Sequence, residues 1–463
     1  MEFPYGKAPL AILILAIISG AAVLWSSAQQ ASGRPDLIFA TFSKEQGAAY
    51  AEALPAFEKK YNCHVTIEVV DQAALKNRLA SALLVGAQVP DMVELIDGSM
   101  GYFTKGPIKD VGFVDLTNIM HSSGLYDRIV KSRFTKWSSR GHIFCLPHDV
   151  HPVMLCYRRD LVEQMGIDVN QLTTWDKFCA VGREVVKKNT DANGMVSHYM
   201  IDMFNDGLDG LRIMILQHGG TIFNNKGQVE FDTPGNAEVI IWEVKQLEGP
   251  TRIAFPCGWG QPLSRAMIDG LCLFYFCPDW RTEQFQSDVP MLAGKLDLMP
   301  LPAWTEGGVR TTTWGGTGLA ITKQCKQRGD KYFDLAWKLA QYLYLDPQQL
   351  GERFQTTHVL PPEKDLWSLP VFDQRSSFYS GVKLARVYAN LAPYIPQEFV
   401  SPYQEQAAGK LSAAFLDAMQ YYNDHGDKGL MDYVMGDLHV KADYVRKLMA
   451  RNVFLASDSK GAS

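Results

Sequence analysis

The sequence reads LIFATFSKEQGAAYAEALPAFEKKYNCHVTIEVV from Leu37 to Val70. Its first six residues and its last six are short runs rich in apolar and β-branched side chains, which predict two β-strands. Residues 47–61 between them place apolar side chains at helical spacing: Tyr50, Ala53, Leu54 and Phe57. A strand, a helix and a strand in this order predict a βαβ unit with parallel strands.

The same alternation continues downstream of this unit. A helix is predicted over 73–85, and the apolar run 92–96 predicts a third strand of the same sheet. Ligands of parallel α/β sheets bind beyond the carboxyl ends of the strands. We therefore expect the segments 41–45 and 97–100, which follow the first and third strands, to form walls of a binding site.

The middle of the chain predicts a second α/β region. Residues 143–146 and 153–157 have strand-like composition, and 175–188 is typical of a helix with Thr174 as its N-cap. A short strand, 221–223, is expected between two glycine-containing turns. Beyond Gly316 the pattern becomes helical, with helices predicted over 330–344, 381–391, 402–422 and 430–449.

The composition is that of a folded protein. The 463 residues are 47% hydrophobic and 21% charged, unlike a disordered chain, and this length predicts two large lobes or several domains. Lys and Arg number 45 against 50 Asp and Glu, which gives a net charge of −5. Because the sequence has no long basic stretch to neutralise phosphates, nucleic acid is not expected as a partner.

An apolar, uncharged run extends from residue 9 to residue 25. Such a run is typical of an exported protein. Its 17 residues lie between the lengths of a signal-peptide core and of a membrane span, so residues 1–35 are either a cleaved signal peptide or a retained anchor with a linker. Ser26-Ser27-Ala28 fits a cleavage site. We expect the protein in the periplasm or on the outer face of the cytoplasmic membrane, with 9–25 as the anchor if it is retained.

Eight cysteines are spread thinly along the sequence, without a Cys-x-x-Cys motif. This distribution does not fit a disulfide-dense domain or a thioredoxin-like redox protein. Cys257, Cys272 and Cys277 lie close enough in sequence for one pair to bridge. The others are expected to be buried thiols.

The order of short motifs resembles that of the bacterial extracellular solute-binding proteins of the maltose-binding type, the sugar-capturing subunits of ABC importers. The motifs cover nearly the whole chain after the apolar run. They are ALPAFEKKY (53–61), VPDMV (89–93), LP (146–147), CYRRDL (156–161), TWDKF (174–178), GGTIF (219–223), CPDW (277–280), WGGTGLAI (314–321) and AWKL (336–339). The chain departs from the family in having Tyr157-Arg158 where Tyr-Asn is frequent, and in lacking a lipidation cysteine near 20–35.

The resemblance implies an α/β fold of the type II periplasmic-binding-protein kind, a two-lobed hinged clamshell after an N-terminal hydrophobic helix. Lobe 1 is expected to contain 36–150 and 316–362, lobe 2 to contain 151–315 and 363–455, and 456–463 to form a tail. Crossings between the lobes are expected near 148–153, 313–316 and 360–366. The implied partners are a carbohydrate ligand and the permease subunits of an ABC transporter, and the protein is expected to be a monomer without a cofactor.

A sugar has apolar C–H faces and a ring of hydroxyl groups, so its site needs flat aromatic side chains and fixed hydrogen-bonding groups. Trp280 ends a strand-like run and directly follows Asp279, so we expect this pair to stack on a sugar and accept its hydrogen bond. Trp314 with Gly315 and Gly316 offers a ring beside backbone that a ligand can approach closely. The further candidates, at expected strand ends and at the hinge, are Phe42, Ser43, Glu45, Asp97, Ser99, His148, Asp149, Asp202, Phe204 and Asn205.

Other chemistries are less well supported by the sequence. His142, Cys145, His148 and His151 recur every three residues, but in an extended segment this spacing points successive side chains to opposite faces, so no metal site is expected. The sequence contains no P-loop, H-E-x-x-H or G-x-S-x-G motif. Together with the resemblance, the absence of these motifs makes a non-enzymatic binding protein our primary hypothesis.

Three alternatives stay open. An exported carbohydrate-active hydrolase would need two carboxyl groups about 5–9.5 Å apart across a sugar bond. The same clamshell could serve as a sensor for a signalling partner. It could also bind a non-sugar solute, such as a polyamine in an acidic, aromatic cage or an organic anion in an arginine-rich one.

Overall fold

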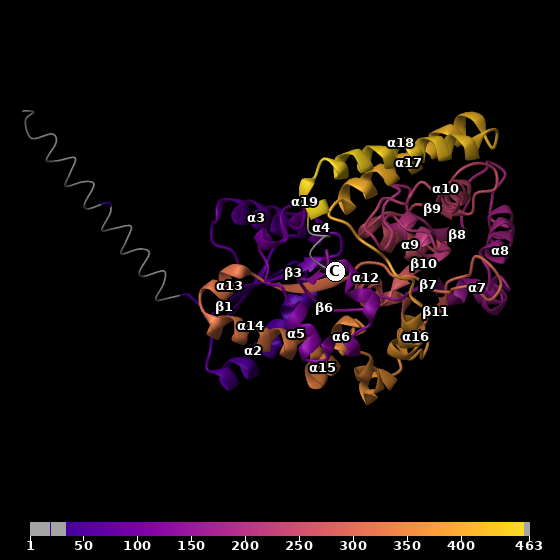
Figure 1. Cartoon of the computed structure of the whole chain (residues 1–463). Helices are drawn as coiled ribbons and strands as arrows, with labels where there is room; N and C mark the ends of the chain where they lie inside the picture. The colour runs from indigo at the N-terminus through magenta and orange to yellow at the C-terminus, as the bar shows by residue number, and fades with distance from the viewer. Residues whose placement is uncertain (1–18, 20–33, 458–463) are drawn as a thin grey trace, which may run out of the picture.

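The computed structural model describes residue 19 and residues 34–457, which form two α/β lobes lying side by side (Figure 1). The sheet of the first lobe contains β1 (Leu37–Thr41), β2 (Val65–Val69), β3 (Met92–Ile96), β6 (Leu146–Pro147) and β12 (Thr317–Ile321), in the order β2-β1-β3-β12-β6. As predicted, β1 is parallel to β2 and β3, whereas β12 is antiparallel to β3 and β6. The carboxyl ends of β1 and β3 and the amino end of β12 therefore meet at one edge.

Helices α2 (Lys44–Tyr61) and α3 (Gln72–Val85) follow β1 and β2, where the sequence predicts them. Each begins at a capping side chain, since Ser43 accepts a hydrogen bond from the Gln46 amide at 3.2 Å and Asp71 caps α3 in the same way. Later helices α14 (Asp330–Leu345) and α15 (Pro347–Thr357) also belong to this part of the fold. The core of the first lobe includes Phe39, Tyr50, Phe57, Leu319, Leu339 and Tyr344.

The second lobe has its own five-stranded sheet, in the order β11-β7-β10-β8-β9. Its strands are β7 (Val153–Arg158), β8 (Tyr199–Asp202), β9 (Ala254–Phe255), β10 (Cys272–Pro278) and β11 (Leu296–Pro300). The central strand β10 is buried along its whole length, antiparallel to β7 and parallel to β8. The carboxyl ends of β8, β9 and β10 thus meet the amino end of β7 at one edge.

Helices cover this second sheet. They are α7 (Arg159–Gln164), α8 (Trp175–Lys188), α9 (Asp209–His218), α10 (Pro234–Leu247), α11 (Gln261–Asp269) and α12 (Asp279–Asp288). The predicted cap of α8 is confirmed, because Thr174 Oγ1 accepts a hydrogen bond from the Lys177 amide at 3.4 Å. The core of this lobe includes Leu155, Phe178, Leu211, Ile240 and Phe274.

The remaining elements are short. In the first lobe and its surroundings they are α4 (Met100–Phe103), α5 (Thr117–Ser122), α6 (Leu125–Arg128), α13 (Lys323–Gln327), β4 (Ser138–Ser139) and β5 (His142–Ile143). Single turns of 3₁₀-helix are formed by Ile108–Asp110, Lys131–Arg133, Thr135–Trp137, Val169–Gln171, Pro290–Leu292, Lys364–Ser368, Pro370–Asp373 and Ala392–Tyr394.

The C-terminal helices α17 (Gln404–His425) and α18 (Leu430–Ala450) form a hairpin over α10 of the second lobe, drawn in yellow in Figure 1. They follow α16 (Leu384–Leu391) and precede α19 (Val453–Ser457). The segment directly after α18 reaches the first lobe, where the Asn452 side chain donates to the Lys105 carbonyl oxygen at 2.8 Å, and Glu405 of α17 pairs with Lys76 of α3 at 2.6 Å. The hairpin thus contacts both lobes.

The structure differs from the sequence predictions in four segments. The strand predicted over 143–146 is two short strands, because β5 pairs with β4 whereas β6 pairs with β12 of the main sheet. The strand predicted over 221–223 is only an isolated bridge between Phe223 and Val229. The helix predicted from residue 381 begins at Leu384, and the helix predicted from residue 47 begins at Lys44.

The chain passes between the sheets at three places that lie side by side. β6 leads into β7, β11 leads back to β12, and α15 leads into the 3₁₀-helix Lys364–Ser368. The first two passages are bridged by Pro152 and Thr313, and the Val150 amide donates to the Leu360 carbonyl oxygen of the third at 3.2 Å. The lobe limits given above stay a prediction.

The predicted signal peptide or anchor, residues 1–35, lies outside the described residues, apart from residues 19, 34 and 35. Most of the predicted tail, 456–463, also lies outside them. Within the described residues, the structure has no helix with the length and apolar character that a membrane span requires.

Candidate functional site

A cleft of about 660 Å³ lies between the lobes, where the edges of the two sheets face each other. The first lobe contributes Phe42, Ser43, Glu45, Gln46, Gln72, Ile96 and Asp97 to its lining, and the second lobe contributes Asp209, Arg212, Trp259, Trp280, Glu283, Gln284, Ser287 and Asp288. The segments near the passages add His151, Trp314, Gly315, Gly316, Thr317, Thr357 and Val359. A cavity of this size, lined by convergent polar groups and aromatic rings, is typical of a small-molecule site.

Aromatic side chains form one wall of the cleft. Trp259 is 46% exposed, and its ring stacks on Phe204 with the centroids 5.3 Å apart. Trp280 meets Trp314 edge-on at 5.4 Å, and its indole N–H donates to the Trp314 carbonyl oxygen at 3.2 Å. The guanidinium of Arg281 lies 4.8 Å from the centroid of Trp259 and 5.1 Å from that of Trp314. The rings are therefore held in place by neighbours. Trp259 and Trp280 offer apolar surface to a ligand, whereas Trp314 is 4% exposed and mainly supports them.

The first lobe contributes polar groups from the ends of β1 and β3. Ser43 caps α2 and also donates to the Glu45 carboxylate at 3.0 Å. Phe42 precedes them and Asp97 follows β3. All four side chains line the cleft, at the strand ends where the sequence pattern places binding loops.

Four charged side chains join the lobes beside the cleft. Asp97 of the first lobe forms ion pairs with Lys136, at 2.8 Å, and with Arg212 of α9 in the second lobe. Glu398 pairs with both cations, at 3.0 Å from Lys136 and 2.9 Å from Arg212. Burial would raise the pKa of Asp97, but Arg212 and Lys136 outweigh it and hold that pKa well below its usual range. Since Asp97 and Arg212 also line the cleft, a ligand that contacts either of them acts on an interlobe contact.

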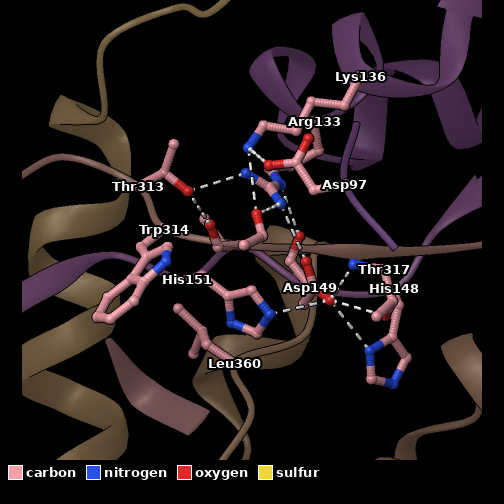
Figure 2. Close-up of polar contacts among 12 residues, drawn as sticks. Asp97, Arg133, Lys136, His148, Asp149, His151, Thr313, Trp314, Thr317 and Leu360 are labelled. Carbon is pink, nitrogen blue, oxygen red and sulfur yellow. Dashed lines mark hydrogen bonds and ion pairs between the residues drawn. The ribbon is translucent and has the colours of Figure 1, made fainter. Parts of the chain in front are cut away.

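Asp149 lies at the centre of a buried network that joins the passages (Figure 2). Its Oδ1 is 3.0 Å from Arg133 Nη2, and its Oδ2 accepts hydrogen bonds from the amide and hydroxyl of Thr317 at 2.8 and 2.9 Å. Arg133 Nη1 donates to Thr313 Oγ1 at 3.0 Å. His151 Nε2 lies 3.0 Å from Asp149 Oδ2. One carboxylate thus ties the first and second passages to the first lobe.

His151 is held between two carboxylates. Its Nε2 faces Asp149 and its Nδ1 lies 2.5 Å from Asp279 Oδ1, while the other oxygen of Asp279 accepts from the Leu360 amide at 2.7 Å. Burial lowers the pKa of His151, but the two carboxylates outweigh burial and raise this pKa from 6.5 to about 9. His151 is therefore a buried imidazolium at neutral pH, and it connects the first passage to the third.

We expect the free energy of unfolding to decrease as the pH rises through about 9. Because the folded state raises the pKa of His151, the imidazolium stabilises this state fully below pH 6.5, and the contribution is lost as the pH rises through about 9. The expected loss is on the order of 3 kcal/mol. Urea unfolding of the wild type and of His151→Gln across this range measures it. A wild-type stability as independent of pH as that of the variant would contradict the assignment.

Gly316 lets the second passage run against this network. Its φ of +140° is unfavourable for other residues, and a Cβ atom would lie 2.2 Å from Arg133 Nη2 and 3.2 Å from Asp149 Oδ1. At Gly315, with φ +82°, a Cβ atom would lie 3.6 Å from Trp280 Nε1. Packing within the hinge therefore requires a glycine at position 316. Both glycines also leave space through which a ligand can approach the backbone.

The structure separates the predicted site residues into two groups. Those that line the cleft are Phe42, Ser43, Glu45, Asp97, Trp280, Trp314, Gly315 and Gly316. Those that do not are Ser99, His148, Asp149, Asp202, Phe204, Asn205 and Asp279.

The burial of Asp279 contradicts the prediction that this residue accepts a hydrogen bond from a sugar. Its side chain is fully buried, and its oxygens are occupied by His151 and by the amides of Trp280 and Leu360. Asp149 is likewise buried within the hinge. Both carboxylates are used to hold the passages together, which leaves no oxygen for a ligand.

Of the other five residues outside the lining, four are buried against protein groups and one is exposed. His148 is buried between Asp149 and Tyr50, and Ser99 is buried at the start of α4. Asp202 accepts a hydrogen bond from the Cys257 amide at 2.9 Å. Phe204 is buried behind Trp259, and Asn205 is exposed next to it in sequence.

Sequence reasoning missed several lining residues. Trp259 stands between two glycines, Gly258 and Gly260, which is a signal for an exposed aromatic side chain on a tight loop. Arg212 carries no comparable signal, because it belongs to the mostly buried helix α9 and reaches the cleft through tertiary packing. The others are Gln46, Gln72, Ile96, His151, Asp209, Glu283, Gln284, Ser287, Asp288, Thr317, Thr357 and Val359.

The histidines considered as a metal cluster bind protein groups instead. His142 pairs with Asp115 at 2.7 Å, and His148 and His151 both contact Asp149. Across residue 19 and residues 34–457, no three His, Cys, Asp or Glu side chains are arranged to hold a metal ion.

The protein has two α/β lobes, joined by three neighbouring passages, with a polar and aromatic cleft between them. This architecture is that of two-lobed solute-binding proteins. Residues 42–350 match the sequence profile of the bacterial extracellular solute-binding protein family. The chain therefore belongs to this family.

Relatives of known name support this assignment. The arabinooligosaccharide-binding protein of Halalkalibacterium halodurans is 25% identical over 402 residues, which are 85% of this chain and 86% of that protein. The arabinooligosaccharide-binding protein of Bacillus subtilis is 27% identical over 322 residues, 68% of this chain and 71% of that protein. The solved structure of the sugar-binding protein MalE from Xanthomonas citri has a TM-score of 0.69 at 17% identity, and the match covers 90% of this chain and 99% of that one. This structural likeness concerns the fold.

Proposed function

We propose that the protein is the substrate-binding component of an ABC importer and that it captures an oligosaccharide in the cleft between its lobes. The observation that carries the proposal is the lining of this cleft, where the indole rings of Trp259 and Trp280 lie among hydroxyl, amide and carboxylate groups of both lobes. Aromatic faces suit the C–H faces of sugar rings, and the polar groups suit their hydroxyls. The family and the sugar-binding relatives support the same substrate class.

The binding cycle would be a hinge equilibrium. A ligand that contacts Glu45 and Ser43 of the first lobe together with Trp280 of the second favours the closed arrangement, because those contacts exist together only when the lobes approach. The buried network around Asp149 would keep the passages in register during this movement. The closed form would then be presented to the permease.

The remaining parts of the proposal follow from the same family. The protein would be exported by its N-terminal apolar segment, either cleaved from it or anchored through residues 9–25, and would act as a monomer. Its lobes would have the limits predicted above. It would bind sugar without cleaving it.

A thermal-shift screen of arabino-, galacto- and malto-oligosaccharides tests the proposal. At a ligand concentration of 100 Kd, binding is expected to stabilise the folded state by about 2.7 kcal/mol, which raises the Tm measurably. Chromatography after prolonged incubation should return the ligand intact. Accumulated cleavage products would favour the exported hydrolase, and a protein that responds to no sugar would contradict the proposed substrate class.

A cationic solute is a second candidate, favoured by the charges in the cleft. Five carboxyl groups line it, from Glu45, Asp97, Asp209, Glu283 and Asp288, against the cations Arg212 and His151. Acidic and aromatic groups together attract ammonium groups. Spermidine therefore belongs in the same screen, where a response to it without a response to sugars would select this candidate.

A further inference from the structure

Two thiols lie against each other at the base of the loop that carries Trp259. The Sγ atoms of Cys257 and Cys272 are 3.5 Å apart, with Cys257 6% exposed and Cys272 fully buried. Both sulfur atoms also lie 3.8 Å from the Phe255 carbonyl oxygen. Since the bond length of a disulfide is about 2.05 Å, an approach of about 1.5 Å would join the two sulfur atoms.

This pair of thiols lies at the start of the loop that positions Trp259. The Cys257 amide donates to Asp202 Oδ1 at 2.9 Å, which fixes the start of the loop to the end of β8. Trp259 follows between Gly258 and Gly260, whose φ angles of 75° and 65° lie in the left-handed region that favours glycine. The backbone that carries the indole ring is therefore held at Cys257, in addition to the packing of the ring against Phe204 and Arg281.

We propose that Cys257 and Cys272 are oxidised to a disulfide bond in the exported protein and that this bond fixes the Trp259 loop for ligand binding. The bond would connect the loop to the first residue of the buried strand β10 and would enclose α11. Closing this loop restricts the unfolded chain, which stabilises the folded state. The bond itself is argued from the two sulfur atoms, whereas its effect on binding rests on the proposed function.

The oxidant is a protein disulfide of the compartment into which the chain is exported, acting by thiol–disulfide exchange. The thiolate of Cys257, the more accessible of the two, attacks one sulfur of that disulfide and releases the other as a thiol. The thiolate of Cys272 then attacks the Cys257 sulfur of the mixed disulfide and releases the oxidant as a dithiol. Two electrons and two protons pass from the chain to the oxidant.

The exchange is expected during folding rather than after it. Burial raises the pKa of the Cys272 thiol well above its usual range, so the folded protein contains little of the thiolate that has to attack. Before the loop packs against Phe255, the Cys272 thiol is in water and ionises more easily. The bond, once formed, is shielded by the same burial.

Peptide mapping by mass spectrometry tests the bond in the full chain, exported into the oxidising compartment of a bacterial host, with free thiols blocked under denaturing conditions. We expect a cross-linked pair of peptides containing Cys257 and Cys272 that separates on reduction. Reduction is also expected to lower the Tm by about 5 °C. Recovery of both cysteines as blocked thiols, or a cross-link from either one to Cys156 or Cys277, would overturn the proposed bond.

The effect on the ligand is tested by calorimetric titration with the oligosaccharide found in the screen. The double variant Cys257→Ser/Cys272→Ser is expected to bind several-fold more weakly than the wild type. The matched control Cys156→Ser/Cys277→Ser removes two other buried thiols of the second lobe and should retain its affinity. Equal affinity of the two double variants would overturn the role of the bond in binding.

Two further outcomes separate this inference from the proposed function. If the double variant does not fold, the wild type produced without export, in the reducing cytoplasm of the host, measures the same change in affinity without a substitution. A cross-link in a protein that binds no sugar supports the bond and contradicts the proposed function. Sugar binding in a protein without the cross-link supports the function and contradicts the bond.

Discussion

Replacing Trp280 with alanine is expected to raise the dissociation constant for the oligosaccharide at least about thirtyfold. A buried aromatic anchor commonly contributes about 2 kcal/mol or more to a complex, and 2 kcal/mol corresponds to this factor. The ring of Trp280 lines the cleft and is held edge-on against Trp314, with its N–H engaged by the Trp314 carbonyl oxygen. Its orientation is thus fixed before the ligand arrives, so little conformational entropy is lost on binding. Isothermal titration calorimetry measures the change.

Trp242→Ala is the matched control for this substitution. Trp242 belongs to α10, is partly buried like Trp280, and packs edge-on against Trp175 and Trp304 outside the cleft lining. Its loss should lower the urea midpoint without changing the affinity of the folded protein. If Trp280→Ala behaves like the control, with lower stability and unchanged affinity, the ring is a packing residue and the stacking role is wrong.

The first lobe was largely predictable because its signals are local. The strands at 37–41, 65–69 and 92–96 and the two intervening helices follow from hydrophobic period alone, and their caps lie within three residues of the helix starts. The rule that ligands bind at the carboxyl ends of parallel strands points to Phe42, Ser43, Glu45 and Asp97, and these residues line the cleft. The antiparallel β12 was not predictable in this way, because its partner β3 lies more than 200 residues earlier.

The roles of the carboxylates could not be predicted, for the same reason. The sequence predicts that Asp279 faces a ligand because it follows a strand. Besides the adjacent Trp280 amide, however, the groups that occupy its oxygens come from residues 128 and 81 positions away, His151 and Leu360. Asp149 is satisfied by Arg133 and by Thr317, which is 168 residues away. Local sequence shows only that an acidic residue lies near a hinge. Whether its oxygens face a ligand or another segment depends on tertiary contacts with residues far away in the sequence.

Asp149→Ala is expected to lower the free energy of unfolding by about 3–5 kcal/mol, a loss typical of removing one partner from a buried ion pair. The substitution leaves the guanidinium of Arg133 buried with only neutral hydrogen-bond acceptors among these contacts. It leaves the imidazolium of His151 buried with one carboxylate partner, Asp279. The amide of Thr317 also loses its acceptor. Urea unfolding at pH 7 measures the loss.

Asp373→Ala provides the control, because Asp373 also pairs with two cations, Lys383 and Arg386, but on the exposed surface. Water replaces these contacts, so the urea midpoint should barely change. Removing Asp149 should also shift the pH-dependent loss of stability below 9, because one of the two carboxylates that raise the pKa of His151 is gone. A midpoint for Asp149→Ala as close to wild type as that of the control would mean that the network around His151 does not stabilise the hinge.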